Sequence, residues 1–444
     1  MSFTALYIPI GVGTFHLESA ENEFNKSINL LKKLAPEVTV PGEMLLTIDK
    51  LKEYLDGKTA DLAIVQNLTF ANAAYMSEIL HRLDCPVLLW TLREPVIDGT
   101  RLRLNSLTGA FSAANTLKAF GRSFAYVFGS PDEERTEKEV KAVISAAKVK
   151  LALNSLNLLQ VGHTPQGFGF GRALDSEMLK TFGVTVSSIE ARELIDKAKT
   201  FTDEDITAYL ADANNRINGL DGIEEKNVKD FARLYRAYKE YVDENNIGAL
   251  ASRCWPDFFT SFGTPVCSVL GILNDLGIPS ACESDSYGAL SMYISQFLTG
   301  KSVFFGDPVS LDEDENTVTF WHCGMAPCSL AREDTGACAG LHCNRHIGPT
   351  LEFGTKAADK VTIFRVGRTP EGKFRFFITK GESLDKPKQF YGTSTVVKTE
   401  NPAREIIEGA VRDGWEPHFA VAQDDIAEEL KALAVMLEIE VCVF

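Results

Sequence analysis

The sequence lacks the features of exported and membrane-spanning proteins. Its start, MSFTALYIPIGVGTF, has no basic residues followed by a long apolar run and a small-residue cleavage site. No later stretch is apolar for the roughly 18 residues that a membrane span needs. We therefore expect a soluble, cytoplasmic protein that has no membrane partner.

Positive charge is scarce. The chain holds 45 Lys and Arg against 61 Asp and Glu, which gives a net charge of −16 at neutral pH. A field of this sign repels phosphate backbones. The charge balance thus argues against nucleic acid as a partner.

A disulfide framework and low-complexity sequence are also missing. The nine cysteines are odd in number and occur in a chain without export features, so we expect reduced thiols. Hydrophobic residues make up 45% of the chain and charged residues 24%, which is typical of globular proteins. At roughly 150 residues per domain, 444 residues allow two to four domains.

The first part of the chain alternates short apolar runs with helical patterns. Strand-like runs are at 5–10, 60–65, 86–90, 123–128 and 157–161, and helical patterns include 22–34, 70–83 and 134–151. Continuously apolar strands separated by helices indicate a parallel sheet that is covered on both faces. A second alternation begins near His163 and includes a charged helix at 225–244.

Beyond about Pro349 the pattern changes to strands at short spacing, such as 361–366, 373–379 and 394–398. We therefore predict an α/β fold in three regions. Two tandem Rossmann-like α/β domains, residues 1–160 and 161–348, precede a β-rich C-terminal domain, residues 349–444. The central domain would carry metal-binding carboxylates and the C-terminal domain a histidine ligand.

Two acidic residues follow predicted strands of the central region. Glu283 comes after the run 277–282, and Asp307 comes 24 residues later, after 303–306. A helical pattern at 289–298 would connect adjacent parallel strands and place both carboxylates on one rim. Such a pair can bind a hard divalent cation, although acidic residues at strand ends often only cap a helix.

Two histidines have comparable surroundings. His322 and His418 are flanked by apolar or aromatic residues, where a charged imidazole is disfavoured and a neutral nitrogen is free to bind a metal. A histidine that only packs in the core would have the same sequence surroundings.

These residues resemble those of the L-fucose and L-arabinose isomerases, in particular the shorter fucose-isomerase-like members. The resemblance rests on the segments Arg253–Pro256, Cys282–Asp285, Gly306–Asp307, Trp321–Pro327 and Pro417–His418. It implies that Glu283, Asp307 and His418 bind one Mn²⁺-like ion, and that Glu283 and Asp307 also act as the acid/base pair. It further implies a homo-oligomer, with a hexamer favoured, in which a neighbour's N-terminal domain covers each cleft.

The chemistry of the resembled family suits this set of residues. An aldose becomes a ketose through a cis-enediol when one proton moves between adjacent carbons. Carboxylates, one imidazole and sugar oxygens favour Mn²⁺, or another divalent cation such as Mg²⁺ or Co²⁺, over a thiolate-bound zinc. We place His322 near the sugar hydroxyls, and Arg253 and Trp255 in the same cleft, with Trp255 as an apolar platform.

We therefore predict a metal-dependent aldose–ketose isomerase. Its substrate would be a free pentose, a 6-deoxyhexose or a modified hexose, including an acidic one such as a sulfonated sugar. Arg93, Arg101 and Arg103 form a basic cluster that could receive such a group, and the competing interpretation is a solvated surface cluster.

Two alternatives remain at this stage. The first is a non-catalytic, cytoplasmic sugar-binding or regulatory protein. The second is a zinc or iron–sulfur protein that uses the Cys/His-rich segment 323–346, in which Cys323 and Cys328, and again Cys338 and Cys343, have C-x₄-C spacing. Binding would then centre on Cys328, Cys338 and Cys343.

Overall fold

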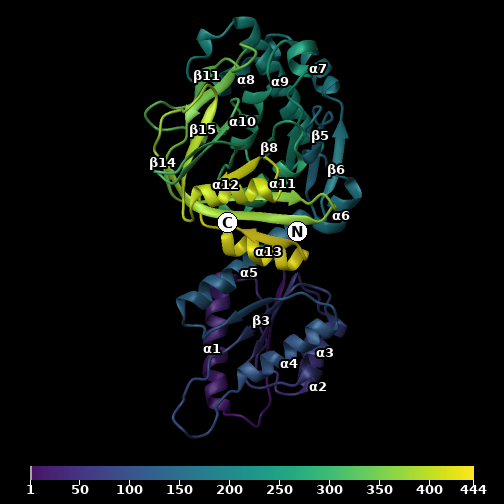
Figure 1. Ribbon diagram of the computed structural model, residues 1–444. Helices are drawn as coiled ribbons and strands as arrows, with labels where there is room; N and C mark the ends of the chain where they lie inside the picture. The colour runs from purple at the N-terminus through teal and green to yellow at the C-terminus, as the bar shows by residue number, and fades with distance from the viewer. Residues whose placement is uncertain (1–2) are drawn as a thin grey trace. The chain divides into compact units, whose positions relative to one another are not determined.

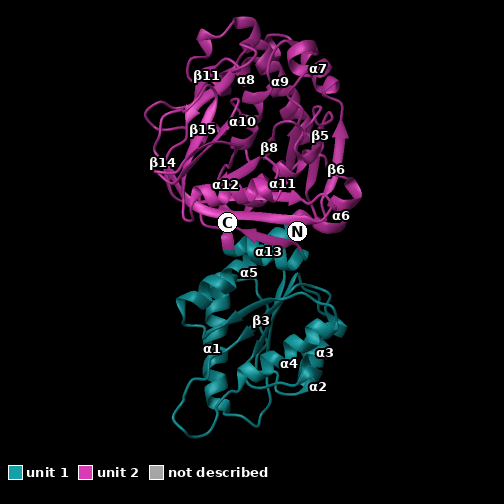
Figure 2. Ribbon diagram, viewed as in Figure 1, with its two compact units in different colours: residues 1–152, 428–438 teal, residues 153–427, 439–444 magenta. Residues whose placement is uncertain are grey.

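The computed structural model describes residues 3–444, which form two compact units (Figure 2). Unit 1 contains the chain up to residue 152 together with residues 428–438, and unit 2 contains residues 153–427 and 439–444. The second and third predicted regions thus lie mostly in one unit, and the three-region division stays a prediction. Within residues 3–444, no helix has both the length and the apolar character to cross a bilayer.

Unit 1 is built on a parallel sheet with strand order β1-β2-β3-β4. The strands are Ala5–Ile10, Leu62–Asn67, Val87–Thr91 and Ala125–Phe128, and the helices are α1 (Leu17–Leu34), α2 (Ile48–Leu55), α3 (Ala73–Arg82), α4 (Ser106–Ala119) and α5 (Glu134–Leu153). Every residue of the first three strands is buried, as expected for a sheet with helices on both faces. Helix α13 (Ala427–Leu437) lies almost wholly in this unit (Figure 2).

Unit 2 contains a second parallel sheet with strand order β6-β5-β7-β8. Its strands are β5 (Asn157–Val161), β6 (Thr185–Ile189), β7 (Ala249–Ser252) and β8 (Ser280–Ala281). The helices that accompany it are α6 (Asp175–Phe182), α7 (Ala191–Thr200), α8 (Thr207–Arg216), α9 (Glu225–Glu244), α10 (Cys267–Asp275) and α11 (Ser286–Thr299). Helix α9 has the bounds that its amphipathic sequence predicts.

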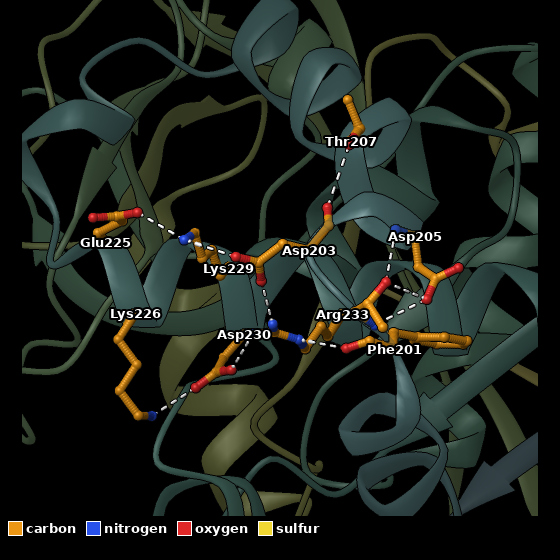
Figure 3. A network of polar contacts seen from close by, with 10 residues as sticks. Phe201, Asp203, Asp205, Thr207, Glu225, Lys226, Lys229, Asp230 and Arg233 are labelled. Atoms are coloured by element: carbon orange, nitrogen blue, oxygen red, sulfur yellow. Dashed lines mark hydrogen bonds and ion pairs between the residues drawn. The ribbon is translucent and has the colours of Figure 1, made fainter.

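The polar side of α9 is tied to the loop before α8 (Figure 3). Arg233 donates hydrogen bonds to the Phe201 carbonyl oxygen, to Asp203 and to Asp230. Lys229 pairs with Asp203 at 2.9 Å. The other side of the helix is buried through residues such as Phe231 and Tyr238, so this charged network faces away from the core.

The rest of unit 2 is a nine-stranded mixed sheet with order β11-β12-β15-β10-β9-β16-β13-β14-β17. Its strands are β9 (Phe304–Asp312), β10 (Thr317–His322), β11 (Cys338–Gly340), β12 (Thr350–Gly354), β13 (Ala358–Arg368), β14 (Phe374–Leu384), β15 (Thr393–Thr399), β16 (Phe419–Ala422) and β17 (Glu440–Val443), and α12 (Ala403–Arg412) precedes β16. Because β14 also pairs with β15, the six strands from β15 to β14 in this order close into a barrel-like ring.

The predicted α/β fold with a β-rich C-terminal part is therefore confirmed. The finer assignment of two tandem Rossmann-like domains stays a prediction. In the first sheet the strands follow chain order, whereas in the second the chain starts at the inner strand β5 and adds strands on both sides.

Helix α11 joins the two sheets of unit 2. It contacts β7 and β8 of the parallel sheet and β13 and β16 of the mixed sheet (Figure 1). Nine of its 14 residues are buried, in agreement with its apolar sequence. The N-terminus of this helix, directly after β8, is where the candidate site forms.

Candidate active site

The site begins at a strained turn between β8 and α11. Glu283 and Ser284 have φ angles of +52° and +56°, a left-handed conformation that costs about 1 kcal/mol or more for each such residue. The surrounding structure holds the turn, because the Ser284 amide donates to the Ser252 carbonyl at 3.1 Å and the Ser284 hydroxyl donates to the Gly162 carbonyl at 3.0 Å. The turn fixes the direction of the Glu283 carboxylate, which is 9% exposed.

Strand register in the mixed sheet brings three further side chains to this carboxylate. Strand β9 lies between β10 and β16, with Asp307 opposite Trp321 and Gly306 opposite Phe419. Asp307 is therefore close to His322, at the end of β10, and to His418, just before β16. The His418 Nε2 atom lies 3.4 Å from an Asp307 oxygen and 3.7 Å from Glu283 Oε2.

His418 is oriented by a buried ion pair. Its Nδ1 atom lies 2.9 Å from Asp285 Oδ2, and Asp285 accepts two hydrogen bonds from the Arg365 guanidinium. The side chains of Asp285 and Arg365 are essentially inaccessible to solvent. Because a carboxylate only accepts, His418 donates from Nδ1 and directs the lone pair of Nε2 toward Glu283 and Asp307.

His322 has the opposite arrangement. Its Nδ1 accepts a hydrogen bond from the Cys323 amide at 2.9 Å, so in the neutral ring the proton is on Nε2. That nitrogen lies 3.3 Å from Glu283 Oε2. His322 thus offers a hydrogen-bond donor to the site, whereas His418 offers a metal ligand.

Burial and charge act differently on the two aspartates. Burial on its own would raise the pKa of Asp285, but the positive charge of Arg365 and the contact with His418 outweigh it and hold the pKa well below its usual value. Burial raises the pKa of Asp307, although 30% of its side chain is exposed. Asp285 is therefore a permanent carboxylate that supports His418.

The geometry fits a divalent cation. Glu283 Oε2 is buried and has no hydrogen-bond partner within residues 3–444. The His322 Nε2 atom lies near this oxygen but is not aligned for a hydrogen bond. The His418 Nε2 lone pair is directed toward the same oxygen. Glu283, His322 and His418 place ligand-type atoms within 4.8 Å of one another, and Asp307 adds a second carboxylate 3.4 Å from His418 Nε2. Two carboxylates and one imidazole are ligands that Mn²⁺ and Mg²⁺ accept.

Four buried thiols lie behind the site. Cys254 Sγ is 3.4 Å from Glu283 Oε1, and Cys267 and Cys323 have their sulfur atoms 3.8 Å apart. The Cys282 thiol interacts with all three. No candidate metal-binding group within residues 3–444 includes Cys328, Cys338 or Cys343, on which the zinc or iron–sulfur alternative centred, although Cys323 and His342 of the same segment form such a group with Cys267.

An aromatic wall borders the site. The rings of Phe168 and Phe170 lie 6.4 Å and 5.4 Å from the His418 ring, and the Trp255 ring lies 6.2 Å from that of Phe168. Trp255 thus belongs to this aromatic wall, and its role as a sugar platform stays a prediction. Arg253 pairs with Asp257 at 2.8 Å and donates to the Trp255 carbonyl, so its observed contacts support the Trp255 turn.

Sequence reasoning missed several of these residues. Asp285 and Arg365 gave no signal of their role, because an ion pair 80 residues apart cannot be read from spacing. Phe168 and Phe170 lie in the glycine-rich segment 162–171, and these glycines were the available signal. In the structure, a Cβ atom at Gly171 would approach the Asp285 Cα to 2.8 Å, so the glycine allows close packing.

One topological prediction was wrong. Glu283 and Asp307 do not end adjacent parallel strands, because β8 belongs to the parallel sheet whereas β9 is antiparallel to β10 and β16 in the mixed sheet. Asp307 lies within β9 and not after it. Helix α11 crosses from one sheet to the other, and this crossing brings the carboxylates together.

The basic cluster belongs to unit 1. Arg93 pairs with Glu133, Arg103 pairs with Asp98, and Arg101 donates to the Thr14 carbonyl. These contacts occupy the three guanidinium groups at least in part. Binding of an acidic sugar by this cluster remains a prediction.

Comparison with known proteins identifies the family. Residues 330–444 match the family model of the L-fucose isomerase C-terminal domain. The whole chain is 59% identical to a sulfoquinovose isomerase of Clostridium sp. (strain MSTE9), over 100% of this chain and 99% of that protein. The chain belongs to the fucose isomerase-like family.

Two further relatives agree with this assignment. Sulfoquinovose isomerases of Priestia aryabhattai and Alkalicoccus urumqiensis are 38% and 36% identical, over 99% of this chain and 99% and 98% of their own lengths. The prediction of an aldose–ketose isomerase that acts on a small sugar is confirmed at this level. These relatives give no support to the non-catalytic alternative.

Proposed function

We propose that this fucose isomerase-like protein interconverts sulfoquinovose, a glucose derivative with a sulfonate on carbon 6, and its ketose isomer. The observation that carries the proposal is the convergence of Glu283, Asp307 and His418 in a chain that is 59% identical to a sulfoquinovose isomerase along its full length. Glu283 and His418 also belong, together with His322, to the one candidate metal-binding group within residues 3–444 that contains no thiol.

We assign the metal ligands to Glu283, Asp307 and His418, with Mn²⁺ as the expected ion and Mg²⁺ or Co²⁺ as alternatives. When bound, such an ion supplies a Lewis acid for two neighbouring sugar oxygens. The orphaned Glu283 Oε2 and the orientation of His418 by Asp285 support this assignment.

Glu283 and Asp307 are the proposed acid/base pair. One carboxylate removes the proton from C2 of the open-chain aldose, and the proton returns to C1 while the hydroxyl proton on O2 leaves and O1 gains one. Both carboxylates lie within 3.7 Å of His418 Nε2, and this closeness supports a role for both at the C1–C2 bond of one bound sugar. His322 donates from Nε2 to a sugar oxygen, and Trp255 packs against the carbon chain.

The quaternary structure and location are part of the same proposal. We expect a cytoplasmic homo-oligomer, with a hexamer favoured, in which a neighbouring chain covers each site. The support is membership of the fucose isomerase-like family. Light scattering coupled to size exclusion should give the mass of six chains, and a monomer mass would contradict this part.

The chemistry is tested by incubating the protein with sulfoquinovose and Mn²⁺ in D₂O. We expect NMR to detect the ketose with deuterium at C1, and deuterium at C2 of the recovered aldose. Glu283→Gln and Asp307→Asn should each lower the rate by about 100- to 10,000-fold, because each removes a proton carrier. The exposed residues Glu315 and Asp314 provide matched controls, Glu315→Gln and Asp314→Asn, which should keep the rate. Near-wild-type rates in a site variant would remove that residue from the mechanism.

A further inference from the structure

Arg345 has no polar partner for its side chain. Within residues 3–444, every other arginine donates at least one side-chain hydrogen bond, whereas the Arg345 guanidinium takes part in no hydrogen bond or ion pair. The chain carries 61 acidic residues against 45 basic ones, so carboxylates are plentiful. A guanidinium without one in such a chain is free to bind an anion from solution.

Two aromatic rings hold this guanidinium in place. Its Cζ atom lies 4.7 Å from the centre of the Phe259 ring and 5.6 Å from that of Trp255. Aromatic faces attract a cation without neutralising it, so they fix the side chain and leave its N–H donors unused. Arg345 is half-buried in the loop between β11 and β12, where its amide donates to the His342 carbonyl at 3.2 Å.

The same rings connect Arg345 to the candidate site. Trp255 directly follows Cys254, whose thiol lies 3.4 Å from Glu283. On its other side, Trp255 contacts Phe168, which contacts His418. All of these residues belong to unit 2. Arg345 thus lies on the aromatic wall of the site, beyond the residue proposed to pack against the sugar.

Open space lies beside this loop. The two residues that precede Arg345, Cys343 and Asn344, line a cavity of about 760 Å³ that also contacts Trp321, the neighbour of His322. Lys388 lines it as well, but its amino group is paired with Glu352. Of the two cations, Arg345 and Lys388, only Arg345 has no carboxylate partner within residues 3–444.

We propose that Arg345 binds the sulfonate of the substrate, at the end of the sugar opposite the reacting carbons. The inference rests on the proposed function, because it names the residue that selects for the anionic group. A guanidinium presents a planar fork of donors that can hold two oxygens of one tetrahedral anion. A neutral hexose would leave this fork unpaired, so Arg345 is a specificity-determining residue and takes no part in proton transfer.

The test compares two substrates in four proteins. D-Glucose has a hydroxyl where sulfoquinovose has the sulfonate, so the two report separately on the reacting end and the anionic end. Wild type, Arg345→Gln, Arg345→Lys and the control Arg332→Gln are assayed on both, with C2 exchange in D₂O to detect slow turnover of glucose. Arg332 lies in the same unit and pairs with Asp334 and Asp385.

We expect Arg345→Gln to lower kcat/KM for sulfoquinovose by about 10- to 100-fold, mainly through KM, since a hydrogen bond to a charged group is lost. The exchange rate of glucose should change less than about twofold, and Arg332→Gln should leave both rates unchanged. Arg345→Lys keeps the charge without the fork and should show an intermediate loss. If the Gln variant does not fold, the Lys variant alone decides.

An unchanged kcat/KM for sulfoquinovose in the Arg345 variants, or an equal loss on both substrates, would overturn this inference. A wild-type protein that does not isomerise sulfoquinovose at all would overturn the proposed function instead. The two failures are therefore distinguishable.

Discussion

At the scale of single residues, the two site histidines differ in which nitrogen is available. His418 donates from Nδ1 to Asp285 and presents a bare Nε2, whereas His322 accepts at Nδ1 from a backbone amide and presents a donor. Their sequence surroundings are alike, so only the partner of the other nitrogen separates a metal ligand from a hydrogen-bond donor. We therefore expect Asp285 to be as important to the site as the residues proposed to bind the ion.

Asp285→Asn should weaken Mn²⁺ binding by about 10- to 100-fold, because it removes the carboxylate that fixes His418. Titration calorimetry on the purified protein measures this directly. Asp230→Asn, in the surface network on α9, is the control and should bind Mn²⁺ normally. Equal affinity in the Asp285 and Asp230 variants would show that His418 needs no orienting partner.

At the scale of elements, α11 places the site through close packing. A Cβ atom at Gly288 would lie 2.6 Å from the Phe305 ring and 2.8 Å from Asp285 Oδ2. Phe305 in turn contacts the His418 ring at 4.8 Å. The helix thus approaches β9 closely only because glycine occupies this position, and the approach sets the distance between Glu283 and Asp307.

Gly288→Ala should lower activity and stability together. Alanine is the better helix former by about 1 kcal/mol, but displacing a buried ring and a carboxylate costs roughly 1–3 kcal/mol. Chemical denaturation and turnover measure the two effects. Gly277→Ala is not a fair comparison because its φ is positive, so Ser295→Ala, on the same helix, serves as the control. A Gly288 variant that is stabilised and fully active would contradict the packing argument.

The elements themselves were largely predictable from sequence, whereas their arrangement was not. The strands 5–10 and 157–161 and the helix 225–244 have the predicted bounds, since continuous apolar runs and a strong amphipathic period identify them locally. The strand β10 was not predicted, so the sequence did not show that Asp307 lies opposite Trp321 and close to His322. β10 pairs with β9 as a local hairpin, whereas the register between β9 and β16 joins residues more than 100 positions apart, such as Gly306 and Phe419, which no local pattern encodes.

The residues of the site were foreseen unevenly for a similar reason. Glu283, Asp307, His322 and His418 stand in short motifs that resemble a known family. Asp285 and Arg365 matter to the site because they form an ion pair with each other. Arg345 is distinctive because its guanidinium has no polar partner within residues 3–444. Such relations exist in three dimensions and leave no mark on the sequence around each residue.

At the scale of the whole molecule, the proposed metal ligands and the residues that orient them all belong to unit 2. Glu283, Asp307, His418 and Arg365 lie within residues 153–427. An ion bound by these residues stabilises the unit that contains them, and unit 1 gains nothing directly.

Removal of metal by a chelator should therefore abolish turnover and lower the melting temperature of one calorimetric transition, that of unit 2. Mn²⁺ at about 100 times its dissociation constant should restore about 2.7 kcal/mol of stability. The Asp307→Asn variant should show a smaller shift with the same ion. Equal shifts in both transitions, or turnover that survives exhaustive chelation, would contradict the assignment.

The most direct test is a crystal structure of the protein with Mn²⁺, recorded at the manganese absorption edge. The account predicts one strong anomalous peak within bonding distance of the Glu283 and Asp307 carboxylates and of His418 Nε2, with His322 outside the ligand sphere. A peak at the buried thiols, or bound through His322 in place of His418, would contradict it.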